Sequence, residues 1–124
     1  MRAGTAATIA VVAALMSGSA MAADGDGNQL IKQCTVTVKA MDGVNVDGYY
    51  DVGYCLGLTQ GVRQTMLFHN VALPAKYRTC FPEGVTNGQG VRIVLKYLQD
   101  HPAELQEPAT VLIHRAYNAA YPCP

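Results

Sequence analysis

The sequence predicts an all-α fold, a small disulfide-stapled bundle of about four helices. Apolar residues recur at three- and four-residue spacing through most of the chain, and four cysteines are spread along it. A stretch with strand propensity, Thr35–Val38, has no clear partner strand, so it is also predicted to be helical. The length of 124 residues fits one domain with one modest core.

The N-terminal residues have the pattern of a secretory signal peptide. Arg2 is followed by an apolar run at Ala6–Met16, and Ala20–Ala22 fits the small-x-small rule for cleavage. An N-terminal anchor is the alternative, but the run is shorter than the roughly 20 residues that a membrane span needs. We therefore predict a signal peptide at Met1–Ala22 and a single domain at Ala23–Pro124, with no later segment apolar enough to cross a membrane.

The first part of the domain is predicted to be a leader, a helix and a loop. The Gly- and Asp-rich leader Ala23–Gly27 is expected to be mobile. Asn28 follows it and can cap a first helix, in which apolar residues recur at helical spacing as far as Val38. Asp42–Gly48 holds two glycines, an asparagine and two aspartates, which is typical of a loop.

The second helix is predicted over Tyr49–His69. Gly53, Gly57 and Gly61 are four residues apart, so they share one face of this helix. Each costs roughly 1 kcal/mol relative to alanine in a helix interior. We expect close packing of another helix of the same chain to offset that cost, and a face for a homodimer or another partner is the alternative.

Two further helical regions are predicted in the second half. Thr86 and Gln89 form a T-x-x-Q capping box, which predicts the start of a helix over Asn87–Asp100. Its apolar stripe at i, i+3, i+4 and i+7 consists of Val91, Val94, Leu95 and Leu98. The last region covers Pro102–Ala120 and is interrupted or restarted at Pro108. Its inward stripe is predicted to be Leu105, Leu112, Ala116 and Ala119 or Ala120.

Composition and motifs argue against an enzyme. The formal net charge is zero at pH 7, which disfavours nucleic acid or an anionic membrane as partner, because both need a basic surface. Ser17 and Ser19 lie in the predicted signal peptide, so serine-hydrolase chemistry is excluded from the domain. Phosphate-binding and zinc-protease motifs are missing, and the histidines His69, His101 and His114 are scattered. We predict no catalytic residue and no cofactor.

The cysteines are predicted to form two disulfides. Export through a signal of bacterial character places Cys34, Cys55, Cys80 and Cys123 in an oxidising compartment. An even number of cysteines in a short exported domain favours disulfides, and at this point three connectivities are open. Zinc is disfavoured because the sequence has no C-x-x-C pair and no histidine close to a cysteine.

An ordered series of short motifs resembles one known family. The motifs are Tyr54–Gly57, Gly61–Val62, Cys80–Thr86, Val91–Leu98, His101–Leu105 and Tyr121–Cys123. No single motif is specific, but the ordered set is, and it covers about Leu30–Cys123. In this series the chain resembles the Rap/Tai immunity family of small periplasmic proteins.

The resemblance implies an all-helical, disulfide-bonded protein that binds a protein toxin. Characterised members bind and block peptidoglycan amidases delivered by type VI secretion. Departures at Leu58, Gln106 and Asp42–Asp47 leave the fold intact and leave the cognate toxin open. We therefore expect a periplasmic immunity protein, and the alternative is a periplasmic binding or chaperone-like helical module with a different protein partner.

On this basis we expect the disulfides Cys34–Cys55 and Cys80–Cys123. The first would join the first two helices, and the second would tie the segment before the third helix to the C-terminal residues. Each closed loop would contribute about 3–4 kcal/mol by the chain-entropy estimate.

Two loops could reach into the active site of a toxin, Ala40–Gly48 and Asn70–Thr79. We favour the second, because the long helix would anchor its start and Cys80 would hold its end. Its candidate partner-binding residues are Leu73 and Tyr77 as apolar anchors and Lys76 and Arg78 as rim charges. A plain connector whose apolar residues pack inward is the alternative.

Overall fold

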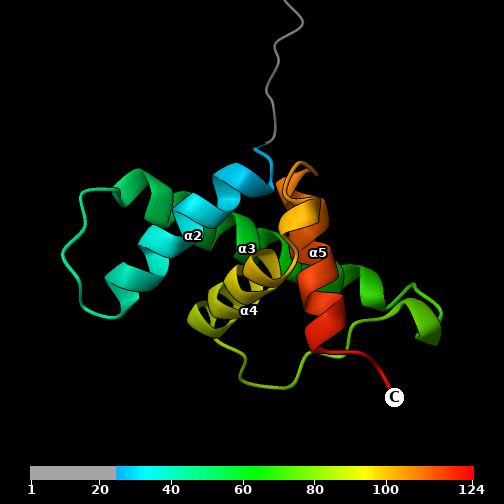
Figure 1. The fold of residues 1–124 in the computed structure, drawn as a ribbon. Coiled ribbons are helices and arrows are strands. Elements are labelled where there is room, and N and C mark those ends of the chain that lie inside the picture. Colours follow the sequence, from blue (N-terminus) through cyan, green and yellow to red (C-terminus); the bar gives the residue numbers. More distant parts are fainter. Residues whose placement is uncertain (1–24) are drawn as a thin grey trace, which may run out of the picture.

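Four α-helices and two short 3₁₀ helices form the part of the chain that the computed structural model describes, residues 25–124 (Figure 1). They are α2 Gly27–Met41, α3 Tyr49–Asn70, η1 Ala75–Tyr77, α4 Asn87–Asp100, η2 Pro102–Glu104 and α5 Ala109–Ala120. The predicted signal peptide lies outside the described residues. Within residues 25–124 the only β-type pairings are two isolated bridges, and no helix is both long and apolar enough to cross a membrane. The predicted all-α class is confirmed.

The start of α2 differs from the prediction. The capping residue is Asp26, whose Oδ1 accepts a hydrogen bond of 2.9 Å from the backbone N–H of Gln29. Asn28 lies inside the helix, and its side chain donates to the carbonyl oxygen of Leu105 at 3.1 Å. Asp26 and Asn28 are both good capping residues. Contacts with residues 105–109, distant in the sequence, place Asp26 at the capping position.

The described part of the leader is held against the last helix and is not a free end. The backbone N–H of Ala109 donates to the carbonyl of Gly25 at 2.9 Å, and the N–H of Gly27 donates to the carbonyl of Glu107 at 3.1 Å. A Cβ on Gly27 would lie 2.4 Å from Cδ1 of Leu112. Gly27 is therefore required by this close approach.

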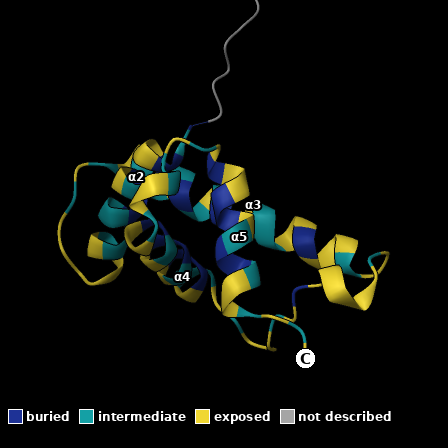
Figure 2. Cartoon of the chain, turned by 45° about the vertical axis from the view of Figure 1, so that its right-hand side comes forward, coloured by how far each residue is buried: buried dark blue, intermediate teal, exposed yellow. Residues whose placement is uncertain are grey.

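The core lies where α2, α4 and α5 meet the middle of α3 (Figure 2). Its largest fully buried side chains include Leu30, Leu98, Leu112, Ile113 and Tyr117. The predicted inward stripe of α5 is partly wrong, because Ala119 and Ala120 are exposed. The buried face of α5 is instead Ala109, Leu112, Ile113, Ala116 and Tyr117.

The predicted packing of a helix onto the glycine face of α3 is also wrong. Gly53, Gly57 and Gly61 are exposed, and a Cβ on any of them would meet no atom of residues 25–124 within 4 Å. Of the 22 residues of α3, only Cys55, Thr59 and Met66 are buried. The alternative, a face for a second copy or another partner, stays a prediction.

Specific polar and covalent ties hold α3 in place. Cys34 and Cys55 form a fully buried disulfide between α2 and α3, as predicted. Arg63 donates to the carbonyl of Val85 and to Oδ1 of Asn87, both at 2.7 Å, and so ties α3 to the start of α4. There the capping box of Thr86 and Gln89 is present as predicted.

Tyr117 joins α5 to α3. Its Oη donates to the carbonyl of Thr59 at 3.3 Å, and burial raises the pKa of Tyr117 to about 12. The same hydroxyl lies beside Gly90 of α4, where an added Cβ would come within 2.6 Å of it.

Alanine at Gly90 and alanine at Gly57 should change stability in opposite directions. Gly90→Ala would force a buried, hydrogen-bonded tyrosine to move, so we expect a loss of about 1–3 kcal/mol. Gly57→Ala adds a methyl group in open space and raises helix propensity, so we expect a gain of up to about 1 kcal/mol. Urea unfolding of both variants measures the difference, and an equal effect of the two changes would contradict this packing.

A second polar cluster fixes η2 against α4 and α5. Tyr97 Oη donates to Oε2 of Glu104 at 2.9 Å, and Arg115 donates to Glu104 at 3.2 Å and to Glu107 at 2.7 Å. These donors, Tyr97 first, hold the pKa of Glu104 below its ordinary value of 4.5. The folded protein therefore binds a proton at Glu104 more weakly than the unfolded chain does.

The contribution of Glu104 to stability should be complete above pH 4.5 and lost as the pH falls through the lowered pKa. Glu104→Gln should therefore give a shallower loss of stability in acid than wild type. Urea unfolding over a series of acidic pH values tests this, with Glu83→Gln as an exposed control. If Glu104→Gln and wild type lost stability in parallel, the cluster would not act in this way.

Candidate partner-binding site

The C-terminal half of α3 and the loop after it project from one end of the molecule (Figures 1 and 2). We call residues 71–79, which include η1, the projecting loop. This end carries several large exposed apolar side chains. They are Leu67, Phe68, Val71 and Tyr77, of which Phe68 is 78% and Val71 86% exposed. A group of exposed apolar side chains on a small domain can form a contact surface. A second such group, Met41, Val44, Tyr49 and Tyr50, lies in and beside the loop of residues 40–48.

Asn70 closes the base of the projecting loop. Its Nδ2 donates to the carbonyl of Thr79 at 2.6 Å, and its Oδ1 accepts from the backbone N–H of Thr79 at 3.2 Å. One side chain thus satisfies both backbone groups of Thr79, which is only 2% exposed. The last residue of α3 therefore fixes where the loop returns to the bundle.

The chain after Thr79 is tied to the C-terminal residues. Cys80 and Cys123 form the second disulfide, with Cα atoms 4.9 Å apart, so the predicted pairing is confirmed. The N–H of Cys80 donates to the carbonyl of Tyr121 at 2.9 Å, and Thr79 pairs with Pro122 in an isolated bridge. The loop is therefore anchored covalently at its end, as expected from the sequence.

The tip of the loop is braced from within. Nε of Arg78 donates to the carbonyl of Leu73 at 2.7 Å, and the N–H of Tyr77 donates to the carbonyl of Pro74 at 2.9 Å. Nζ of Lys76 lies 4.7 Å from the centre of the Tyr77 ring. A loop held in this way loses little conformational entropy when it binds a partner.

The predicted partner-binding residues come together at one hollow of about 920 Å³. Lys76, Tyr77 and Arg78 are exposed, and Leu73 is half-buried. The opposite wall is formed by residues that the sequence analysis did not select: His114 and Asn118 of α5, with Pro122, Cys123 and Pro124. No local signal in the sequence connects α5 with the projecting loop.

A short chain of polar side chains joins the loop to α5. Oγ1 of Thr79 donates to Oδ1 of Asn118, and Nδ2 of Asn118 lies 3.0 Å from Nδ1 of His114. Together with Asn70, these groups connect α3, the loop and α5. The wall of the hollow is thus held in a fixed relation to the loop.

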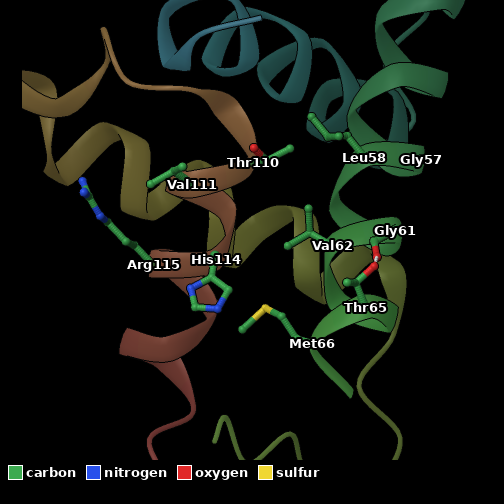
Figure 3. A pocket seen from close by; sticks show the side chains of 10 residues that line it. All are labelled: Gly57, Leu58, Gly61, Val62, Thr65, Met66, Thr110, Val111, His114 and Arg115. Carbon is green, nitrogen blue, oxygen red and sulfur yellow. Dashed lines mark hydrogen bonds between the residues drawn. The ribbon is translucent and has the colours of Figure 1, made fainter. Parts of the chain in front are cut away.

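A second hollow of about 630 Å³ runs along the groove between α3 and α5 (Figure 3). Its floor includes Gly57 and Gly61, and Val62 and Val111 line it from the two helices. A third hollow, of about 250 Å³, lies between the other two. His114 lines all three, so the hollows adjoin one another between the middle of α3 and the projecting loop, and we call the set of three the depression.

The other candidate loop, residues 40–48 in the sequence analysis, lies at the opposite end of the molecule (Figure 1). Asp42 there pairs with Arg92 at 2.5 Å, and the adjacent Tyr49 and Tyr50 are 77% and 73% exposed. This loop has no disulfide at its base. The projecting loop, in contrast, is closed twice, by the hydrogen bonds of Asn70 to Thr79 and by the disulfide Cys80–Cys123. We call this its double closure.

Within residues 25–124, no group of three or more His, Cys, Asp or Glu side chains is placed to hold a metal ion. The depression can instead contact another macromolecule through apolar side chains, cations and hydrogen-bonding groups. The fold and this site define a small disulfide-bonded helical domain that presents a braced loop.

The chain belongs to the Rap1a immunity protein family. The family model matches residues 26–123, which is nearly the whole described domain. No curated protein and no solved structure was found to match the chain. Membership of an immunity family implies that the partner is a protein toxin.

Asn70→Ala should loosen the projecting loop without unfolding the bundle. The change leaves the buried N–H and C=O groups of Thr79 without their partner, which costs about 1–3 kcal/mol locally. Hydrogen exchange should therefore become faster at residues 71–79 and stay unchanged in α2 and α4. Gln64→Ala, an exposed change on the same helix, is the matched control, and equal exchange in both variants would show that Asn70 does not close the loop.

Proposed function

We propose that this protein is a periplasmic immunity protein that inhibits a type VI secretion peptidoglycan amidase by inserting its projecting loop into the active-site cleft of the toxin. Membership of the Rap1a family supports the immunity role. Two disulfides are consistent with an oxidising compartment, and the predicted signal peptide would deliver the chain there. The protein acts by binding and needs no catalytic group of its own.

The observation that carries the proposal is the double closure of the projecting loop by Asn70 and by Cys80–Cys123. An inhibitor that plugs a concave site must expose a narrow segment and keep it in one conformation. Tyr77, which is 59% exposed, and Arg78 belong to the residue types that dominate interface energetics.

The alternative is a periplasmic binding or chaperone-like module with a different partner. The exposed side chains of Phe68 and Val71 favour this alternative, because they could hold an apolar segment of many proteins. A chaperone-like module would bind such segments weakly and without selecting one toxin.

A direct test starts from the neighbouring genes, because the proposal predicts that one of them encodes a secreted peptidoglycan amidase. Purified residues 23–124 should inhibit its hydrolysis of peptidoglycan with one binding site per amidase. Unrelated peptidoglycan amidases should stay active in the same assay. If the neighbouring gene encodes no such enzyme, or its product stays active with excess protein, the amidase part of the proposal is wrong.

The double change Tyr77→Ala and Arg78→Ala should weaken binding to the amidase by about 2 kcal/mol or more. This corresponds to about a 30-fold rise in Kd. The helical circular dichroism spectrum should stay unchanged, since both side chains are exposed. Titration calorimetry or surface plasmon resonance measures the difference.

The matched control is the double change Tyr49→Ala and Lys39→Ala, which removes an exposed tyrosine and an exposed cation at the opposite end of the molecule. Its affinity should equal that of wild type. If the control weakened binding and the change at Tyr77 and Arg78 did not, the binding site would move to the loop of residues 40–48.

A further inference from the structure

The two segments that build the hollow beside the projecting loop contain no acidic residue. Neither residues 52–82 nor residues 108–124 include an Asp or Glu. Lys76, Arg78 and His114 line the hollow, so its charged side chains are cationic. Pro124, the last residue of the sequence, also lines it, and its backbone carboxylate is an anionic group at the edge of this cationic set. Although the formal net charge of the chain is zero, cationic side chains are in excess at this end of the molecule.

Lys76 and Arg78 form no ion pair within the described residues. Within residues 25–124 the ion pairs are Arg92–Asp42, Lys96–Asp100, Arg115–Glu104 and Arg115–Glu107. None of them includes Lys76 or Arg78. Nε of Arg78 donates to the carbonyl of Leu73, and the two terminal NH₂ groups of its guanidinium are available to a partner.

Apolar groups accompany these charges. Leu73, Tyr77 and Pro122 line the same hollow, and Leu73 and Tyr77 also line the smaller hollow that joins it. A surface that fits this end must therefore bring carboxylates to Lys76 and Arg78 and an apolar side chain between them.

We infer that the toxin segment seated against this hollow is acidic, with carboxylate side chains on either side of an apolar residue. The identity of the partner as a toxin rests on the proposed function. The complex then has two contacts. The projecting loop enters the toxin, and an acidic segment of the toxin lies in the hollow beside that loop. Opposite charges on the two surfaces also accelerate their encounter, and salt weakens this effect.

The first experiment measures the association rate with the neighbouring amidase at about 0.02 and 0.3 M salt. Wild-type association should slow clearly at the higher concentration. Lys76→Glu with Arg78→Glu should lower the low-salt rate by at least about tenfold and reverse the salt dependence, because salt screens the repulsion between the new carboxylates and the acidic segment. Lys76→Glu alone keeps the contact of Arg78 with Leu73, so its intermediate effect would show that charge and not loop damage is responsible.

The matched control is Lys32→Glu with Lys39→Glu, which changes the net charge equally on α2, away from the hollow. Its association rate should stay within about threefold of wild type, because neither lysine lines the hollow and the attraction falls off with distance from the contact. Equal slowing by both pairs would mean that only net charge matters, and would overturn the inference.

The second experiment does not require an amidase. The probes are three synthetic octapeptides that alternate leucine with glutamate, glutamine or lysine. The glutamate peptide should shift the NMR signals of Lys76, Tyr77, Arg78 and Asn118, and the other two should leave them unchanged. Equal shifts with the glutamine peptide, or shifts scattered over the protein, would overturn the inference.

The two experiments separate the two claims. If the amidase fails to bind wild type and the glutamate peptide binds at the hollow, the proposed toxin is wrong and the acidic preference stands. If the amidase binds wild type with a rate independent of salt and of Lys76 and Arg78, the proposed function stands and the acidic segment is wrong.

Discussion

The structure depends on how α3 is held, because this helix buries very little of itself. Only three of its 22 residues are buried, and three of its exposed positions are glycines. Half-buried apolar side chains, Leu56, Leu58 and Val62, pack this helix against the core, and a few further attachments fix its position. The attachments are specific: the Cys34–Cys55 disulfide, the bonds from Arg63 to the start of α4, and the bond from Tyr117 to Thr59.

This mode of attachment leaves the outer surface of α3 available. A helix fixed at a few points can remain exposed along one whole side and extend beyond the bundle at one end. The projecting loop begins where α3 ends, so its position is set by a rigid element and not by a flexible linker. The C-terminal residues then close the loop from the other side through Cys123.

Local signals in the sequence predicted the helices well. The Thr86–Gln89 capping box and the apolar stripe after it defined α4 to the residue. The cysteine pairing, which was expected only after the family resemblance, was confirmed as well. The errors arose where contacts distant in the sequence decide the outcome. Periodicity alone could not show that α5 buries Tyr117 and leaves Ala119 exposed, because that depends on how the helix is turned against α3 and α4.

The candidate site was predictable only in part for the same reason. The loop could be selected because a helix end and a cysteine bracket it. The opposite wall, with His114 and Asn118, could not, because some 40 residues and a whole helix separate it from the loop. No helix of the described part of the chain covers the glycines of α3, and the sequence could not show this, because the same four-residue spacing occurs on packed and on open helix faces.

The closure of the loop at its base has a consequence for how recognition can diversify. Asn70, Thr79 and Cys80 fix the conformation through backbone groups and a disulfide, and none of them lies at the tip. Substitutions at the exposed positions between them therefore change the surface offered to a partner without disturbing the bundle. A lineage under pressure from changing toxins can exchange specificity at the tip while the scaffold stays constant, which separates the evolution of binding from the evolution of stability.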